Sequence, residues 1–170
     1  SVLSLGGVVY CRTVHVGGRH MDDAITEHMR EHHDLLISQE MAESLKHGIG
    51  CALPPAVERT MIAKGRGLRT GFPMQVEVTA SEVHMALADP VGRISQSIIA
   101  SLERIPPDLA SDVAEMGVVL TGGCALLVDL DRALGEATGM PVVVPDDPIC
   151  AVVVGAARYL AEPAPNRAAM

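Results

Sequence analysis

Aromatic side chains are nearly absent from this chain of 170 residues, which has no Trp, one Phe and two Tyr. Any hydrophobic core must therefore consist of aliphatic residues and methionine. Such a core is feasible, because 48% of the residues are hydrophobic and the mean hydropathy is +0.28. This length fits one compact domain or two small ones.

Positive charge is also scarce. The chain has 13 Lys and Arg against 21 Asp and Glu, which gives a net charge of −8. Nucleic-acid binding normally needs a basic face, so the composition argues against a nucleic-acid partner. The longest apolar run, around residues 152–157, is far too short to cross a bilayer, so we expect no membrane segment in this chain.

Motifs of hydrolases and nucleotide-binding loops are missing as well. We find neither GxSxG nor a P-loop sequence, and spacing alone assigns no catalytic residue. The four cysteines (Cys11, Cys51, Cys124 and Cys150) are widely spaced, with no CxxC pair. We expect reduced, small core residues of a cytosolic protein. Because the chain starts with Ser, we also expect a fragment or a processed product.

Turn residues and hydrophobic periodicity divide the chain into short strands and helices. Asp22 and Asp23 would lie in the first turn of a helix, where the helix dipole favours acids. Ser38 would cap the next helix, and Pro90 should kink or break the longest one. In chain order we expect a hairpin of strands at residues 1–5 and 8–16, helices at 21–36 and 39–48, strands at 57–63 and 74–79 joined by an exposed loop, helices at 81–105 and 108–116, a buried strand at 117–120, a helix at 124–138, a strand at 142–144, a helix at 148–160 and a disordered tail at 162–170. This order predicts an α/β fold at both ends, with a helical and hairpin insert between them.

The strongest local signal is the segment VVLTGGCALL, in which an apolar strand leads into Gly122 and Gly123 and then into a helix. Glycines allow a close approach of the backbone to a ligand, and free N–H groups at a helix start attract anions or polar rings. A strand-to-helix turn without a ligand would have the same pattern. Both interpretations stay open on the residues alone.

Glu43 and Lys46 are three residues apart, so they would lie on one exposed helix face. They could grip a ribose and an adenine edge, but such pairs are common on solvated helix faces. His28 and His32 have a spacing known from zinc sites, with His33 beside them. Since no third ligand of suitable spacing is evident, we expect these histidines to be divided between core edge and surface, and we assign no metal ligand.

Four segments together resemble the MreB family of bacterial actin-like, rod-shape-determining proteins. They are SLGGVVYCRTVHVGGRHMDDAI, EMAESLKHGIG, ERIPPDLASDVAEMGVVLTGGCALLVDLDRAL and TGMPVVVPDDPICAVVVGAARYL. The resemblance covers nearly the whole chain, and it is specific because PPDLASD, LTGG and TGMPV follow one another in this order. It implies the second half only of an actin-like ATPase fold, which contains a ribonuclease H-like subdomain. Residues 1–17 and 81–161 would form this larger subdomain, and residues 18–80 a smaller helix-plus-hairpin insert.

The resemblance also implies a nucleotide site for ATP with Mg²⁺. The family's E-x-x-K segment, which holds the nucleoside, matches Glu43, Ser44, Leu45 and Lys46. The family's GGG-A adenosine turn matches Gly122, Gly123, Cys124 and Ala125. The third glycine is Cys124 here, and its side chain would narrow the adenine pocket. The phosphate loops, the catalytic acid and the membrane-contacting segment of the family have no match in this chain, so we expect no catalysis from it alone.

The resemblance implies a cytoplasmic protein that assembles into filaments beneath the membrane, by self-association or with full-length MreB-like partners. Cell-wall synthesis and membrane shape proteins would be further partners. We also expect the isolated half to expose apolar surface and to self-associate. An alternative is a truncated paralogue that acts on full-length filaments as a nucleotide-independent interaction module. A metabolic kinase or chaperone ATPase of the same superfold is a third hypothesis, which the motif order disfavours.

Overall fold

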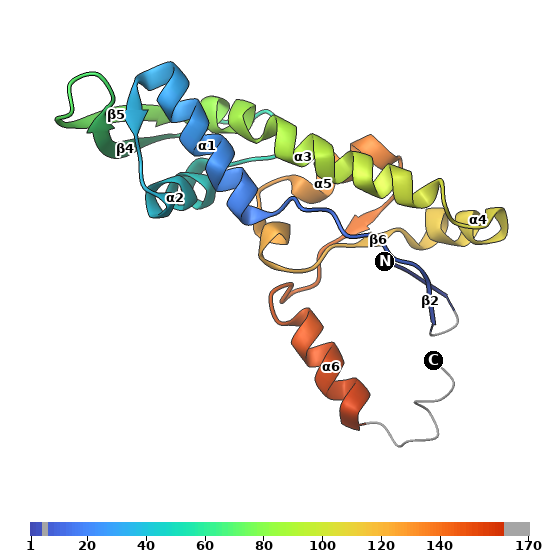
Figure 1. Ribbon diagram of the computed structural model, residues 1–170. Helices are drawn as coiled ribbons and strands as arrows, with labels where there is room; N and C mark the ends of the chain where they lie inside the picture. The colour runs from blue at the N-terminus through green and yellow to red at the C-terminus, as the bar shows by residue number, and fades with distance from the viewer. Residues whose placement is uncertain (5–6, 162–170) are drawn as a thin grey trace.

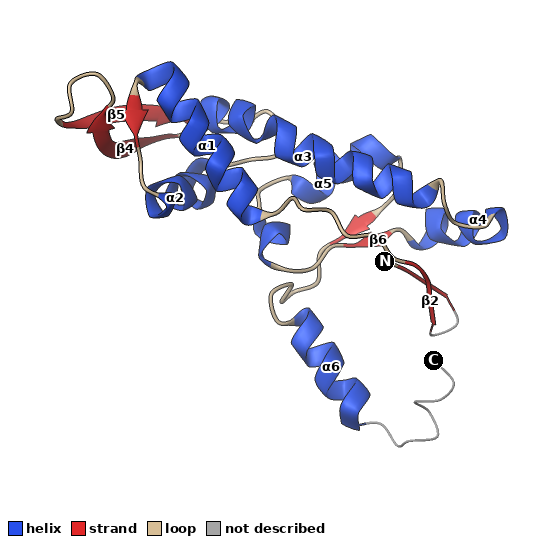
Figure 2. Cartoon of the chain, in the orientation of Figure 1, coloured by secondary structure: helices blue, strands red, loops and turns tan. Residues whose placement is uncertain are grey.

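Three helices and a small antiparallel sheet form the densely packed part of the molecule. The computed structural model describes residues 1–4 and 7–161. Helices α1 (Gly18–His33), α2 (Gln39–Ile49) and α3 (Ala80–Leu102) contact one another, and α1 runs alongside α3 (Figure 1). Strands β3 (Leu35–Leu36), β4 (Thr60–Gly67) and β5 (Pro73–Thr79) form the sheet in the order β3-β4-β5, at one end of these helices (Figure 2).

The hydrophobic core is aliphatic, as the composition predicts. Apart from Cys51, its largest fully buried side chains are Met21, Ile25, Met29, Leu35, Leu45, Val78, Val83, Leu87, Leu130 and Leu134. They come from α1, α2, the sheet, α3 and α5 (Leu130–Thr138) and form one cluster. Buried residues of both predicted subdomains therefore share this cluster. The boundary between residues 18–80 and the rest of the chain stays a prediction.

The predicted first helix ends early because the backbone turns at Asp34. Its φ of 51° lies in the left-handed region, and its N–H donates to the carbonyl of Met29. The chain then enters β3, where Leu35 pairs with Gly67. Helix α1 also begins at Gly18 rather than residue 21, so Asp22 lies beyond its first turn. The predicted helix at 21–36 was therefore displaced at both ends, while α2 has the predicted N-cap, since Ser38 accepts a hydrogen bond from Met41 N–H.

The predicted exposed loop at residues 64–73 is confirmed only for residues 68–72, because β4 continues through Gly67 and β5 begins at Pro73. The strand predicted at 57–63 begins only at Thr60. A Cβ atom on Gly65 would overlap the carbonyl oxygen of Leu36. Glycine at this position allows β3 to approach β4 closely. Gly65 and Gly67 are therefore part of the strand pairing, whereas Gly71, with φ 72°, lies in the turn.

Helix α3 begins with a capping box. The Thr79 hydroxyl accepts from the Glu82 N–H, and the Glu82 carboxylate accepts from the Thr79 N–H at 2.8 Å. The helix is not broken at Pro90, which is buried within it. Burial of Leu87 and Val91 on either side outweighs the hydrogen bond that proline cannot donate.

The two ends of the chain are more open than this core. Strands β1 (Val2–Ser4) and β2 (Gly7–Tyr10) pair antiparallel, and the predicted second strand at 8–16 stops at Tyr10. Helix α4 spans Pro107–Met116, and β6 (Val118–Val119) pairs in parallel with β7 (Val142–Val143). The predicted strand at 117–120 is not buried, since Val119 is 67% exposed. The predicted tail at residues 162–170 lies outside the described residues.

The last two predicted helices also differ from the structure. The helix predicted at 124–138 divides into a four-residue 3₁₀ turn, η1 (Gly123–Leu126), and α5, because Val128 between them pairs with Cys51. Helix α6 begins at Ala151 rather than residue 148, ends at Ala161 and has no buried residue. It extends away from the other helices in Figure 1. Within the described residues, no helix is both long and apolar enough to cross a bilayer.

We expect Thr79→Ala to lower the free energy of unfolding by about 1 kcal/mol, because the first turn of α3 loses its side-chain acceptor. Thr79→Ser keeps a hydroxyl at the N-cap and should stay close to the wild type. Urea denaturation followed by circular dichroism measures both variants. Equal stability of Thr79→Ala and the wild type would contradict this role of the cap.

The capping box also predicts an acid-dependent loss of stability. Burial opposes ionisation of Glu82, but hydrogen bonds from Thr79 and His33 outweigh it and hold the pKa of this carboxyl below its ordinary value of 4.5. A lowered folded pKa gives stability above the unfolded pKa, and this stability is lost as the pH falls through the folded pKa.

We therefore expect the stability difference between the wild type and Glu82→Gln to be full above about pH 4.5 and to shrink below it. Glutamine still completes a capping box, so the difference isolates the charge. Urea denaturation at several pH values measures it, with the exposed Glu136→Gln as the control. A difference that does not change with pH would contradict the prediction.

Candidate functional site

A cavity of about 490 Å³ lies where the start of α1, the C-terminal half of α2 and the η1 turn meet. These segments are far apart in the sequence. The chain brings them together through the bridge between Cys51 and Val128, in which the Ala52 N–H donates to the Val128 carbonyl at 2.8 Å. The residues that line the cavity are Gly18, Met21, Glu43, Lys46, His47, Gly50, Gly123, Cys124, Leu126, Leu127, Val128 and Ile149.

Four of the eight predicted nucleotide-contact residues line this cavity, namely Glu43, Lys46, Gly123 and Cys124. The two predicted segments, 43–46 and 122–125, therefore meet at one place. The structure therefore brings together two segments that lie almost 80 residues apart in the sequence. The contact of any of these residues with a nucleotide stays a prediction.

The other four predicted residues do not line the cavity. Leu45 is fully buried in the core, and Ala125 is also buried. The Ser44 hydroxyl donates to the carbonyl of Glu40 in the preceding turn of α2. Gly122 has φ +87°, and its N–H donates to the Pro148 carbonyl at 2.7 Å, so its role in this structure is to shape the turn.

Lys46 differs most from the sequence expectation of an exposed helix face. Its Nζ lies 2.7 Å from Asp22 Oδ1 and 3.4 Å from the Gly18 carbonyl oxygen. The side chains of Lys46 and Asp22 are 10% and 11% exposed. An ammonium group has three N–H donors, so two bonds of this kind leave one donor at the cavity wall. Glu43, by contrast, is exposed, as predicted.

The η1 turn provides backbone donors rather than a long helix start. The first N–H groups of a helical turn have no acceptor within it, so the amides of Gly123 and Cys124 remain available. A Cβ atom on Gly123 would meet no atom within 4 Å, so this side of the turn is open. The site thus combines one carboxylate, one buried ammonium group and two backbone amides.

Cys124 takes up space next to the start of α1. A Cβ atom on Gly18 would lie 3.7 Å from Cys124 Sγ and 3.5 Å from Lys46 Nζ. The thiol therefore narrows the cavity on this side. That it narrows an adenine pocket stays a prediction. All four cysteines are unpaired. Only Cys51 is buried, so the expectation of four core residues is wrong for Cys11, Cys124 and Cys150.

Sequence reasoning missed several lining residues. His47 and Ile149 have no motif around them that indicates a site. Gly50 had a detectable signal only in its position after the E-x-x-K helix, and a Cβ atom there would overlap the Lys46 carbonyl. Asp22 was assigned to the helix dipole, because nothing in the sequence indicates that it faces Lys46.

Comparisons with known proteins agree in family and fold. The family model described as MreB/Mbl protein matches residues 1–167. The chain is 43% identical over 160 residues to the cell shape-determining protein MreB of Escherichia coli K12. This match covers 94% of this chain and 46% of that protein. It is 34% identical over 155 residues to the cell shape-determining protein Mbl of Bacillus subtilis 168. This match covers 91% of this chain and 46% of that protein.

The fold is similar to the crystal structure of MreB5 of Spiroplasma citri bound to AMPPNP. The TM-score is 0.87 at 29% identity, over 91% of this chain and 46% of that one. The chain thus spans about half the length of the relatives it matches. The predicted fold, the second half of an actin-like ATPase, is confirmed, and the chain belongs to the MreB/Mbl family.

Proposed function

We propose that the chain is the half of a cell shape-determining, actin-like cytoskeletal protein that holds the adenosine end of ATP. The observation that carries this proposal is the meeting of segments 43–46 and 122–125 at one cavity. MreB5 of Spiroplasma citri has crystal structures bound to AMPPNP and to ADP, and each of them matches 91% of this chain. We propose that a nucleotide bound to this chain lies against both segments.

The chemistry of the cavity suits a nucleoside. The exposed carboxylate of Glu43 can accept hydrogen bonds from ribose hydroxyls. The amides of Gly123 and Cys124 can donate to an adenine ring or an α-phosphate, and Leu126, which is 59% exposed, offers apolar surface to the base. The third Lys46 donor can reach a ribose or phosphate oxygen.

Phosphate and metal chemistry belong to the other half of the protein in this proposal. Transfer or hydrolysis of a γ-phosphate requires positioned groups and a metal ion around it. We therefore assign Mg²⁺ and the triphosphate contacts to a half that completes the cleft. We further propose that the assembled protein acts in the cytoplasm, forms filaments and associates with the membrane through wall-synthesis and shape proteins.

A second candidate function is a nucleotide-independent interaction module on full-length filaments. The observation that favours it is the Cys124 thiol, which narrows the cavity beside Gly18. In this case the exposed apolar surfaces, rather than the cavity, would carry the function. The two candidates differ in whether the cavity binds a nucleoside.

The test is equilibrium binding of a fluorescent ATP analogue, with Mg²⁺, to the 170-residue chain. We expect Glu43→Gln to weaken binding about tenfold, since a hydrogen bond to a charged group contributes about 1.5–3 kcal/mol. Glu136→Gln removes an exposed carboxylate outside the cavity and is the matched control. Cys124→Gly should strengthen binding, because it widens the cavity.

Lys46→Ala is a poorer test, because it would leave Asp22 buried without its partner. Such a change costs about 3–5 kcal/mol, so weaker binding would also follow from unfolding. Each variant is therefore checked by circular dichroism before binding is measured. If Glu43→Gln binds like the wild type, the nucleoside lies elsewhere. If Cys124→Gly does not bind at millimolar analogue, the second candidate function is preferred.

We also expect the chain to self-associate through α6. Helix α6 exposes Val152 and Val153, which are 68% and 64% exposed, and contributes nothing to the core. Multi-angle light scattering should give a mass that rises with concentration. Val152→Lys with Val153→Lys should lower this rise, whereas Val57→Lys, in an exposed loop, should not. A constant monomer mass for the wild type would refute the proposal.

A further inference from the structure

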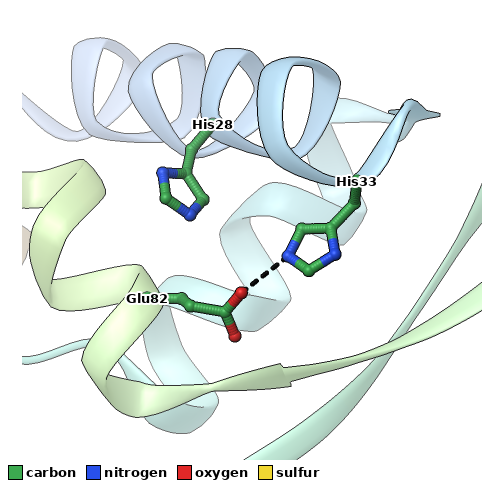
Figure 3. A group of neighbouring side chains, drawn as sticks. All are labelled: His28, His33 and Glu82. Carbon is green, nitrogen blue, oxygen red and sulfur yellow. Dashed lines mark hydrogen bonds and ion pairs between the residues drawn. The ribbon is translucent and has the colours of Figure 1, made fainter.

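Three side chains from two helices converge where the end of α1 packs on the start of α3. His28 and His33 belong to the last turns of α1, and Glu82 lies in the first turn of α3. One ligand atom from each lies within 4.8 Å of the other two. His33 Nε2 is 2.7 Å from Glu82 Oε1, and Figure 3 shows His28 and His33 both directed toward the Glu82 carboxylate.

His28 has a polar atom that the described structure leaves unsatisfied. Its Nε2 is buried and has no hydrogen-bond partner among the described residues. Most buried polar side-chain atoms in proteins have a partner, and an unsatisfied one destabilises the fold. The atom therefore requires a physical explanation, and a ligand beside Glu82 supplies one.

Glu82 and His28 are already oriented. The Thr79 N–H and hydroxyl bind Glu82 Oε2 at 2.8 and 2.9 Å, which leaves Oε1 for the histidines. The His32 ring stacks on His28 with centroids 4.1 Å apart. Burial, with a smaller contribution from His32, lowers the pKa of His28 from its ordinary value. Outer partners of this kind are typical of metal ligands.

We propose that His28, His33 and Glu82 bind one divalent transition-metal ion of the zinc class. Two imidazole nitrogens and one carboxylate oxygen are a preferred donor set for such ions, with a fourth position left for water. Mg²⁺ and Ca²⁺ prefer ligand shells of oxygen atoms, so they fit this set poorly.

Binding needs side-chain movements of at most about 1.5 Å, because the three ligand atoms already lie within 4.8 Å of one another. Ligand atoms around a tetrahedral zinc ion are about 3.3 Å apart, given bond lengths near 2.0–2.1 Å. The ion would replace the hydrogen bond between His33 and Glu82, which must open by about 0.6 Å. It would also satisfy His28. Since His33 and Glu82 are 49 residues apart, the ion would link α1 to α3 as a structural cross-link distinct from the nucleoside cavity.

The experiment uses the full 170-residue chain without a histidine tag, freed of metals by EDTA. Titration calorimetry and thermal unfolding are measured with Zn²⁺, and with Mg²⁺ for comparison. We expect one bound Zn²⁺ per chain and a higher Tm with Zn²⁺ only. His28→Gln and Glu82→Gln should each weaken binding at least tenfold, and Glu82→Gln keeps the capping box so that α3 still forms.

His20→Gln is the matched control, because it removes an exposed imidazole at the other end of α1. It should bind Zn²⁺ like the wild type. Co²⁺ in place of Zn²⁺ checks the ligand type, since the proposed site has no thiolate and should give no sulfur-to-metal charge-transfer band. A thiolate band, or wild-type affinity in both His28→Gln and Glu82→Gln, would place the ion at other residues and overturn the proposal.

Discussion

Helix α1 packs its apolar stripe against α2 and α3, and both candidate sites depend on this contact. Met21, Ile25 and Met29 lie at helical spacing, and each is at most 1% exposed. Full burial of such a side chain contributes about 1.5–3 kcal/mol, so three of them fix the helix firmly in place. At one end of the stripe, Gly18 and Met21 form a wall of the cavity between α1, α2 and η1. At the other end, His28 and His33 meet Glu82.

The buried pair between Lys46 and Asp22 sets how α2 sits on α1. Removing two charges from water is costly, so a pair of this kind is a poor source of net stability. It does penalise any sliding of the two helices that would separate the charges, and it lies beside the cavity. We infer that the pair contributes more to the relative position of Glu43 and the η1 turn than to the free energy of folding.

Local patterns predicted what depends on local physics. Helical spacing and the Ser38 cap located α2, and the motif resemblance identified two segments that the fold brings to one cavity. Long-range pairing was not predictable in this way. Gly65 indicates a loop until β3 is placed against it, and Val128 appears helical until it pairs with Cys51. Nothing in the sequence joins Asp22 to Lys46.

The three histidines show the same limit for a metal site. The spacing of His28 and His32 suggested zinc, but in the structure His32 is exposed and stacks on His28 rather than facing Glu82. Their predicted division between core edge and surface is confirmed, because His28 and His33 are half-buried. Glu82 is 49 residues from His33, and the sequence indicates only that it lies near the start of a helix. A ligand set of this kind depends on how two helices pack, which spacing along one helix does not encode.

The core helices and sheet are stabilised by burial within the chain, whereas the two-stranded sheets and α6 leave their apolar side chains exposed. Residues of α1, α2, β5 and α3 bury their apolar side chains within the chain. The pairs β1-β2 and β6-β7 have two strands each, and two-stranded sheets are marginal without cover. With almost no aromatic residues, the valines of β6 and α6 must find that cover through extensive contact. A partner half or a second copy can supply such contact. The exposed apolar surface and the open cavity would then both be covered by the same assembly step.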